Sequence, residues 1–168
     1  MQASTPRTEG ESLSSDDQVG DIQQGPRLGV QVRNSQGATK ASRGGRMISI
    51  ELPTPSGHAH NKGHWRAKAR PIKAMRELAY ILAKQAIAEH GRPKADVVEV
   101  RYFFRVPDRR RRDAANMIQQ CKPYIDGIVD SGLITGDHWE VLRIIGVGVM
   151  IDKEKPGVTL RFEFLRAP

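Results

Sequence analysis

The sequence predicts an α+β domain with a small mixed β-sheet and two main helices. Two observations support this class. Apolar residues alternate along four short segments, as they do in half-buried strands, and they recur at helical spacing along two longer segments. The segments follow one another in the order strand, helix, strand, helix, strand, strand. This order predicts a mixed sheet with the helices packed mainly on one of its faces.

Proline and glycine bound the first strand and the first helix. Residues 48–52 alternate as a short strand that ends at Pro53. Pro71 suits the first turn of a helix, where its missing N–H is not needed, and Gly91 ends that helix. One face of this helix is apolar and carries Ile72, Met75, Ala79, Leu82 and Ala86.

The second half of the chain contains a further helix between two strand regions. Residues 97–106 alternate apolar and charged side chains, as a half-buried strand does. A helix is expected after Asp113 and up to Gly132, and Pro123 should kink or restart it because proline donates no backbone N–H.

Two strands, residues 141–151 and 158–165, are predicted to close the domain, joined by a turn. Gly146 and Gly148 inside the first of these strands suggest a close approach of another backbone, such as that of a dimer partner.

The composition changes near Met47 and divides the chain. A length of 168 residues suits one ordinary domain and hardly two. Residues 1–46 contain no Phe, Tyr or Trp and are rich in Ser, Gly, Gln, Asp and Arg. Such a segment buries too little apolar surface to offset the entropy lost on ordering. We therefore expect a disordered tail over residues 1–46 and a folded domain over residues 47–168.

Cysteine content and hydropathy limit the environment of the protein. The single cysteine, Cys121, excludes an internal disulfide framework and a zinc site built from several thiolates. No apolar run approaches the roughly 20 residues that a bilayer span needs, and the N-terminus lacks the order of a signal peptide. We expect a cytoplasmic protein with no membrane partner.

The chain carries an excess of positive charge that is concentrated in one place. Lys and Arg number 27 against 19 Asp and Glu, and four consecutive arginines stand at positions 109–112. Contacts between basic side chains and phosphates release condensed counterions, so a basic face gives affinity for nucleic acid without regard to its sequence. The alternative interpretation of the arginine run is a solvated positive face.

Acidic and amide side chains flank the arginines and offer ligands for a hard metal ion. Asp108 and Asp113 bracket the run, Asn116 follows one turn later, and Lys122 and Asp137 come next along the chain. Mg²⁺ prefers carboxylate and water oxygens, and at a phosphodiester it activates water and neutralises developing charge. The structural alternatives are a helix cap for Asp113, a turn position for Asp137 and a solvated side chain for Lys122.

These residues also carry a resemblance. The stretch PDRRRRDAAN, followed by K-x-x-x-D-G-I-V-x-S-G and a turn with Asp137, resembles the signature of the RusA family of Holliday-junction endonucleases. The resemblance spans Pro107 to about Val149, and the LPTP after the first strand and the loop with Asn61, His64 and Trp65 support it. It implies a RusA-like fold in a bacterial or phage-encoded protein. It also implies a homodimer that cuts four-way DNA junctions with Mg²⁺, or with Mn²⁺, in recombination and repair.

The resemblance implies roles for particular residues. Asp113, Lys122 and Asp137 match catalytic positions, provided that three extra residues are placed between Asn116 and Lys122. We expect the metal to bind Asp113, Asp137 and Asn116. We expect DNA contacts from a set of basic, polar and aromatic residues: Arg109, Arg110, Arg111, Arg112, Asn61, His64, Trp65, Lys68 and Arg70.

One position departs from the family pattern. Where that pattern reads D-x-D-N, this chain has D-A-A-N, so Ala115 replaces an expected carboxylate. The loss of one oxygen ligand should weaken metal binding unless a neighbour substitutes for it, and the candidates are Asn116, Asp126, Asp108 and Glu140. Asn116 is the preferred substitute, with a helix cap as its alternative role. The second function class is therefore a non-catalytic module that binds junctions through the same basic groove and dimer.

Overall fold

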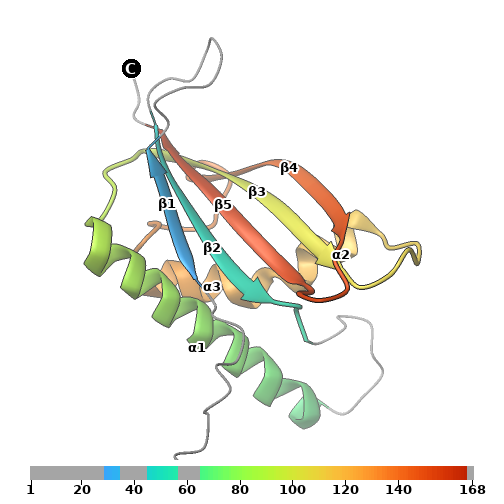
Figure 1. The fold of residues 1–168 in the computed structure, drawn as a ribbon. Coiled ribbons are helices and arrows are strands. Elements are labelled where there is room, and N and C mark those ends of the chain that lie inside the picture. Colours follow the sequence, from blue (N-terminus) through green and yellow to red (C-terminus); the bar gives the residue numbers. More distant parts are fainter. Residues whose placement is uncertain (1–28, 35–44, 57–64, 166–168) are drawn as a thin grey trace, which may run out of the picture.

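A mixed β-sheet forms one layer of the molecule (Figure 1). The computed structural model describes residues 29–34, 45–56 and 65–165. Within these residues the sheet has five strands in the order β1-β2-β5-β3-β4. Their bounds are β1 Val30–Asn34, β2 Arg46–Pro53, β3 Val97–Val106, β4 Leu142–Ile151 and β5 Gly157–Leu165. All neighbours pair antiparallel except β3 and β4, which are parallel, so the prediction of a mixed sheet is confirmed.

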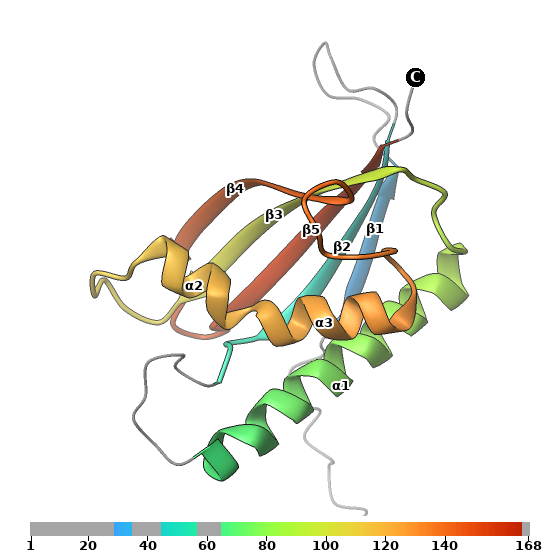
Figure 2. The same cartoon turned by 180° about the vertical axis from the view of Figure 1, so that it is seen from behind.

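The helices form a second layer on one face of the sheet, as the sequence predicts (Figure 2). They are α1 Trp65–His90, α2 Ala114–Gln120 and α3 Lys122–Ser131. Pro123 stands in the first turn of α3, where its missing N–H is not needed, and the chain restarts there after a break at Cys121. Gly132 ends α3 with a left-handed backbone at φ 79°, which glycine adopts without steric cost.

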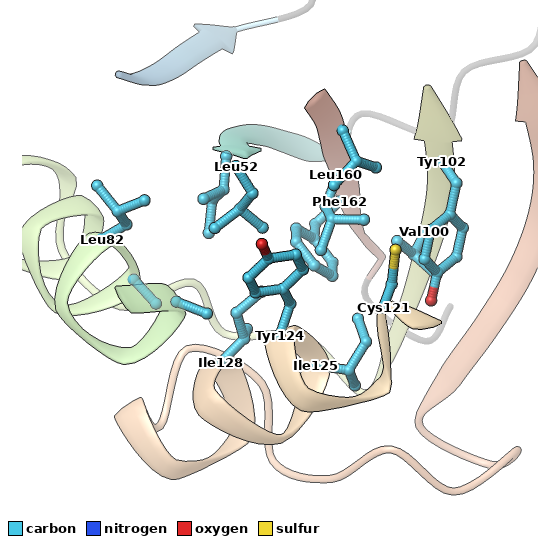
Figure 3. Close-up of a cluster of buried hydrophobic side chains, with 14 of the residues drawn as sticks. Leu52, Leu82, Val100, Tyr102, Cys121, Tyr124, Ile125, Ile128, Leu160 and Phe162 are labelled. Atoms are coloured by element: carbon cyan, nitrogen blue, oxygen red, sulfur yellow. The ribbon is translucent and has the colours of Figure 1, made fainter. Parts of the chain in front are cut away.

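The core lies between these two layers. Alternate residues of β2, β3 and β5 are buried, and they meet apolar residues of α1 and α3. Tyr124 of α3 is fully buried in the middle of this cluster, beside Leu52 and Ile128, and its hydroxyl donates to the carbonyl oxygen of Pro53 at 3.1 Å (Figure 3). Gly127 allows α1 and α3 to pack closely, because a Cβ there would lie 2.1 Å from the carbonyl oxygen of Arg76.

The prediction of a disordered tail over residues 1–46 is wrong for one segment. Residues 30–34 form β1 and pair antiparallel with β2, and β2 itself begins at Arg46. Without β1, the backbone N–H and C=O groups along the outer edge of β2 would have no strand partner. This non-local pairing orders a segment whose composition predicts disorder. Apart from Gly29, Gly45 and Arg46, the rest of the predicted tail lies outside the described residues.

One further expectation needs correction. The first helix begins at Trp65, so Pro71 lies inside it and not in its first turn; packing of α1 against the core offsets the hydrogen bond that proline removes. Gly146 and Gly148 stand across from Arg101 and Phe103 of β3, and the expected approach of a partner's backbone stays a prediction. A Cβ at Gly148 would come 3.0 Å from the Phe103 ring. No described helix is both long and apolar enough to span a membrane.

Candidate active site

Lys122 holds two carboxylates together at the start of α3. Its Nζ donates to Oδ2 of Asp137 at 2.5 Å and also to Oδ1 of Asp126. The hydrogen bonds that Lys122 donates to Asp126 and Asp137 raise the pKa of Lys122, and the bond to Asp137 lowers the pKa of that carboxyl. The lysine side chain is still 56% exposed, so a ligand can reach the cluster from solvent.

Helix geometry and a buried loop produce this convergence. Lys122 and Asp126 are four residues apart, which places them on one face of α3. After Gly132 the loop turns back, and Leu133 and Ile134 anchor it in the core. The buried hydroxyl of Ser131 accepts from the Leu133 backbone N–H at 3.1 Å, which fixes the turn. The loop thereby returns Asp137 to the first residue of α3.

Asp113 caps α2. Its backbone is extended, with φ −81° and ψ 123°, and its Oδ1 accepts from the backbone N–H of Asn116 at 3.1 Å. This contact satisfies one of the free donors at the helix start and confirms the structural alternative for Asp113. Asn116 therefore stands in the first turn of α2 and is not itself the cap. The metal-binding roles of Asp113 and Asn116 stay predictions.

The predicted site residues divide into two groups. Asp113 and Asn116 line a hollow of about 450 Å³ together with Arg112, between the end of β3 and α2. Lys122 and Asp137 do not line this hollow and form the second group. No three His, Cys, Asp or Glu side chains of the described residues lie close enough together to hold a metal ion. Asp113 and Asn116 share this hollow, and the expected ligand set of Asp113, Asp137 and Asn116 stays a prediction.

The sequence predicts Asp126 only as a possible replacement for the metal ligand that is missing at Ala115. Its spacing could have identified it as a site residue, because a residue four positions after Lys122 on a helix lies on the same face. The other two acidic substitutes have partners elsewhere. Glu140 lies 3.7 Å from His138, and Asp108 is bound by arginines. Ala115 is exposed at the second position of α2.

Asp108 organises the arginine loop, which we define as residues 107–113 between β3 and α2. Its Oδ1 accepts from the backbone N–H of Arg110 at 3.0 Å and from the guanidinium of Arg112 at 2.7 Å. These contacts lower the pKa of Asp108, with the Arg110 backbone as the largest cause. Arg112 also donates to the carbonyl oxygens of Asp108 and Arg110, so this arginine holds the loop in shape.

The other three arginines of the loop point outward. Arg110 is 86% exposed and lies 3.7 Å from the Asp108 carboxylate. Arg109 and Arg111 are exposed, and no carboxylate of the described residues lies within ion-pair distance of either. The loop therefore presents unneutralised positive charge to solvent, where a polyanion can reach it.

The N-terminal DNA contacts of the prediction fall largely outside the described residues. Asn61 and His64 lie outside them altogether. Trp65 and Lys68 belong to the first turns of α1, but their side chains are not among those described. Arg70 is exposed on α1.

A scan against protein-family models and a search of curated proteins both gave no match for this chain. The family and the activity are therefore proposed from the motif and from the geometry of these residues.

Proposed function

We propose that this protein is a RusA-like, Mg²⁺-dependent endodeoxyribonuclease that cuts four-way DNA junctions as a homodimer in recombination and repair. The observation that carries the proposal is the convergence of Asp126 and Asp137 on Lys122, close in sequence to the arginine loop. Two acidic groups, a lysine and exposed arginines are groups that can serve phosphodiester hydrolysis.

The acidic groups fit a hard divalent cation. Asp126 and Asp137 already face one positive charge, the ammonium of Lys122, and both offer carboxylate oxygens. Mg²⁺ in proteins is often bound by one or two carboxylates, with water and substrate phosphate as its other ligands. Asp126 and Asp137 would hold the ion, and Mn²⁺ suits the same donors. Asp113 and Asn116, which line the neighbouring hollow, are the further oxygen donors that the resemblance implies.

A bound divalent ion supplies an activated water and neutralises charge on the phosphate. The chain itself supplies binding and orientation. Arg109, Arg110 and Arg111 bind the phosphate backbone from the arginine loop, and Arg112 keeps that loop in place through Asp108. Lys122 binds a non-bridging phosphate oxygen, where its charge stabilises the transition state.

A specific observation favours the second function class, a junction-binding module without turnover. Ala115 offers no oxygen ligand, and no group of three candidate metal ligands exists among the described residues. In this reading Asp126 and Asp137 serve only as ion-pair partners of Lys122, and the arginine loop alone accounts for the affinity for DNA.

Cleavage of a labelled four-way junction, beside a duplex of matched sequence, separates the two classes. We expect the wild type to nick the junction and to leave the duplex intact when Mg²⁺ is titrated. Ala115→Asp should lower the Mg²⁺ concentration needed by roughly tenfold, the effect of about 1.4 kcal/mol from one added ligand. Ala114→Asp is the matched control, because Ala114 is exposed on the same turn of α2.

The outcomes point in different directions. A wild type that binds but does not cut, together with an active Ala115→Asp variant, identifies the binding module. If neither protein cuts while both bind the junction, the nuclease proposal is wrong. An equal gain from Ala114→Asp would show that the added charge acts through the helix terminus and not as a ligand.

A further inference from the structure

β4 is an edge strand with an unusual surface. It pairs with β3 along one side, and no strand of the described residues pairs with its other side (Figure 1). Edge strands in soluble proteins usually carry charges or prolines that discourage pairing with other chains. The ten residues of β4 contain one charged side chain, Arg143, and no proline.

The side chains of β4 are apolar and exposed. Ile144, Val147, Val149 and Ile151 lie on the helix-covered face of the sheet, since they stand beside buried residues of β3. They are nevertheless between 37% and 55% exposed, because the helices do not cover this edge. Met150, on the opposite face, is 57% exposed. A contiguous apolar strip of this kind on a soluble domain marks an interaction surface.

We propose that β4 binds β4 of a second copy of this chain, antiparallel and around a twofold axis. A strand edge is complementary to itself in antiparallel pairing, which gives the two copies identical contacts, as a symmetric dimer requires. Charge favours the same arrangement. Arg143 begins the strand and Asp152 follows its end, so antiparallel pairing places each Arg143 near the partner's Asp152. Parallel pairing would instead place the two arginines together.

The strip also continues into the proposed site. Val149 and Ile151 of β4 line one hollow of about 350 Å³ with Arg109, Arg110 and Met117. The arginine loop follows β3, which is parallel to β4, so it lies at the C-terminal end of both strands. A partner seated on β4 therefore contacts the elements that hold the arginines.

Pairing of two β4 strands sets the distance between two such loops. With the axis near Val147, the two copies of Ile151 lie roughly 26 Å apart at 3.3 Å per residue. The loops then face the same DNA from opposite ends of the paired strands, as symmetric incision at a junction needs. The placement of the two loops on DNA rests on the proposed function, whereas the interface itself is tested without DNA.

Sedimentation of the full chain, without DNA or Mg²⁺, tests the interface. We expect a dimer for the wild type and at least about a tenfold weaker dimer for Val147→Lys, which places like charges on the axis. Ile81→Lys is the matched control, because Ile81 is an equally apolar, 60% exposed residue on α1. A monomeric wild type, or equal weakening by both variants, would overturn the proposal.

Cross-linking tests the same contact in proteins that carry no added charge. Residues on the axis of an antiparallel pair have Cα atoms about 4.5 to 5.5 Å apart, within the range of a disulfide. Oxidation should therefore link Val147→Cys into dimers, and Ile81→Cys should stay monomeric on a denaturing gel. The native Cys121 is buried and burial raises the pKa of its thiol to about 12, so it does not compete.

The failures of the two proposals are distinguishable. Absence of a cross-link through Val147→Cys, in folded protein, overturns the interface even if the wild type cuts junctions. A dimer linked through β4 that binds no junction supports the interface and counts against the proposed function.

Discussion

Nζ of Lys122 lies 2.5 Å from Oδ2 of Asp137, so the first residue of α3 is tied to a loop residue fifteen positions later. Both side chains are more than a third exposed, and ion pairs at such positions contribute at most about 1 kcal/mol to stability. Stability alone therefore gives little reason for this arrangement. A charged cluster that stays accessible is suited to binding a phosphate and its cation.

The pH dependence of this ion pair has a defined sign. Lys122 lowers the pKa of Asp137, so the pair stabilises the fold above the unfolded pKa of Asp, about 3.9, and this contribution disappears as pH falls through the lower folded value. The Lys122 pKa is raised, so at high pH the contribution disappears as pH rises through that folded value. Lys122→Gln should thus lower the free energy of unfolding at pH 7, by at most about 1 kcal/mol.

Urea unfolding in EDTA at pH 7 and at pH 2 measures this difference. We expect the difference between the wild type and Lys122→Gln to be smaller at pH 2, because protonation of Asp137 removes the pair as pH falls through the lowered pKa of Asp137. The exposed Lys94 provides the control substitution, Lys94→Gln, which should show no such pH dependence. A difference that is as large at pH 2 as at pH 7 would show that the carboxylates are not its source.

Two substitutions of Asp113 separate its role as a helix cap from a role in metal binding. Asp113→Ala removes the acceptor for the Asn116 N–H and should cost about 1 kcal/mol of stability. Asp113→Asn keeps an acceptor at the cap, because asparagine caps helices about as well as aspartate. If Asp113 also serves the metal, Asp113→Asn should unfold like the wild type and cut at least about a hundredfold more slowly, a loss of about 2.7 kcal/mol. Cleavage by Asp113→Asn at the wild-type rate would show that Asp113 only caps the helix and does not bind the metal.

Local patterns made much of the fold predictable. The predicted bounds of β3, residues 97–106, agree with the structure, because alternation of period two follows directly from burial of one strand face. The end of α3 at Gly132 was predictable from the left-handed conformation that glycine favours. β1 was not, since five residues in a polar segment gain their order from pairing with β2.

The site was predictable in its residue types and less so in its geometry. The arginine run, Lys122 and Asp137 stand out in the sequence, but their contacts depend on the path of the chain. Burial of Leu133 and Ile134 brings Asp137 back to Lys122, and nothing in the local sequence fixes that path. The division of the arginines into one that braces the loop and three that face solvent likewise depends on Asp108.

That division predicts different behaviour for arginines of the same run. Arg109→Gln and Arg111→Gln should each weaken binding to all DNA and reduce the slope of log K against log salt by about 1. Arg112→Gln removes the side chain that braces the loop through Asp108, so it should also lower the melting temperature. Fluorescence anisotropy at salt concentrations from about 50 to about 200 mM measures these slopes. Unchanged slopes would show that Arg109 and Arg111 are solvated side chains that do not contact phosphate.

The most direct measurement compares Asp137→Asn with Asp130→Asn in cleavage and in binding of a four-way junction. Asp130 is the matched carboxylate, because it also pairs with a basic residue, Arg76, at 2.5 Å, but lies outside the proposed site. We predict that Asp137→Asn abolishes Mg²⁺-dependent cleavage and keeps or strengthens junction binding, since a negative charge is removed where phosphate approaches. Asp130→Asn should cut like the wild type. Cleavage by Asp137→Asn at the wild-type rate, with both variants folded, would contradict the account.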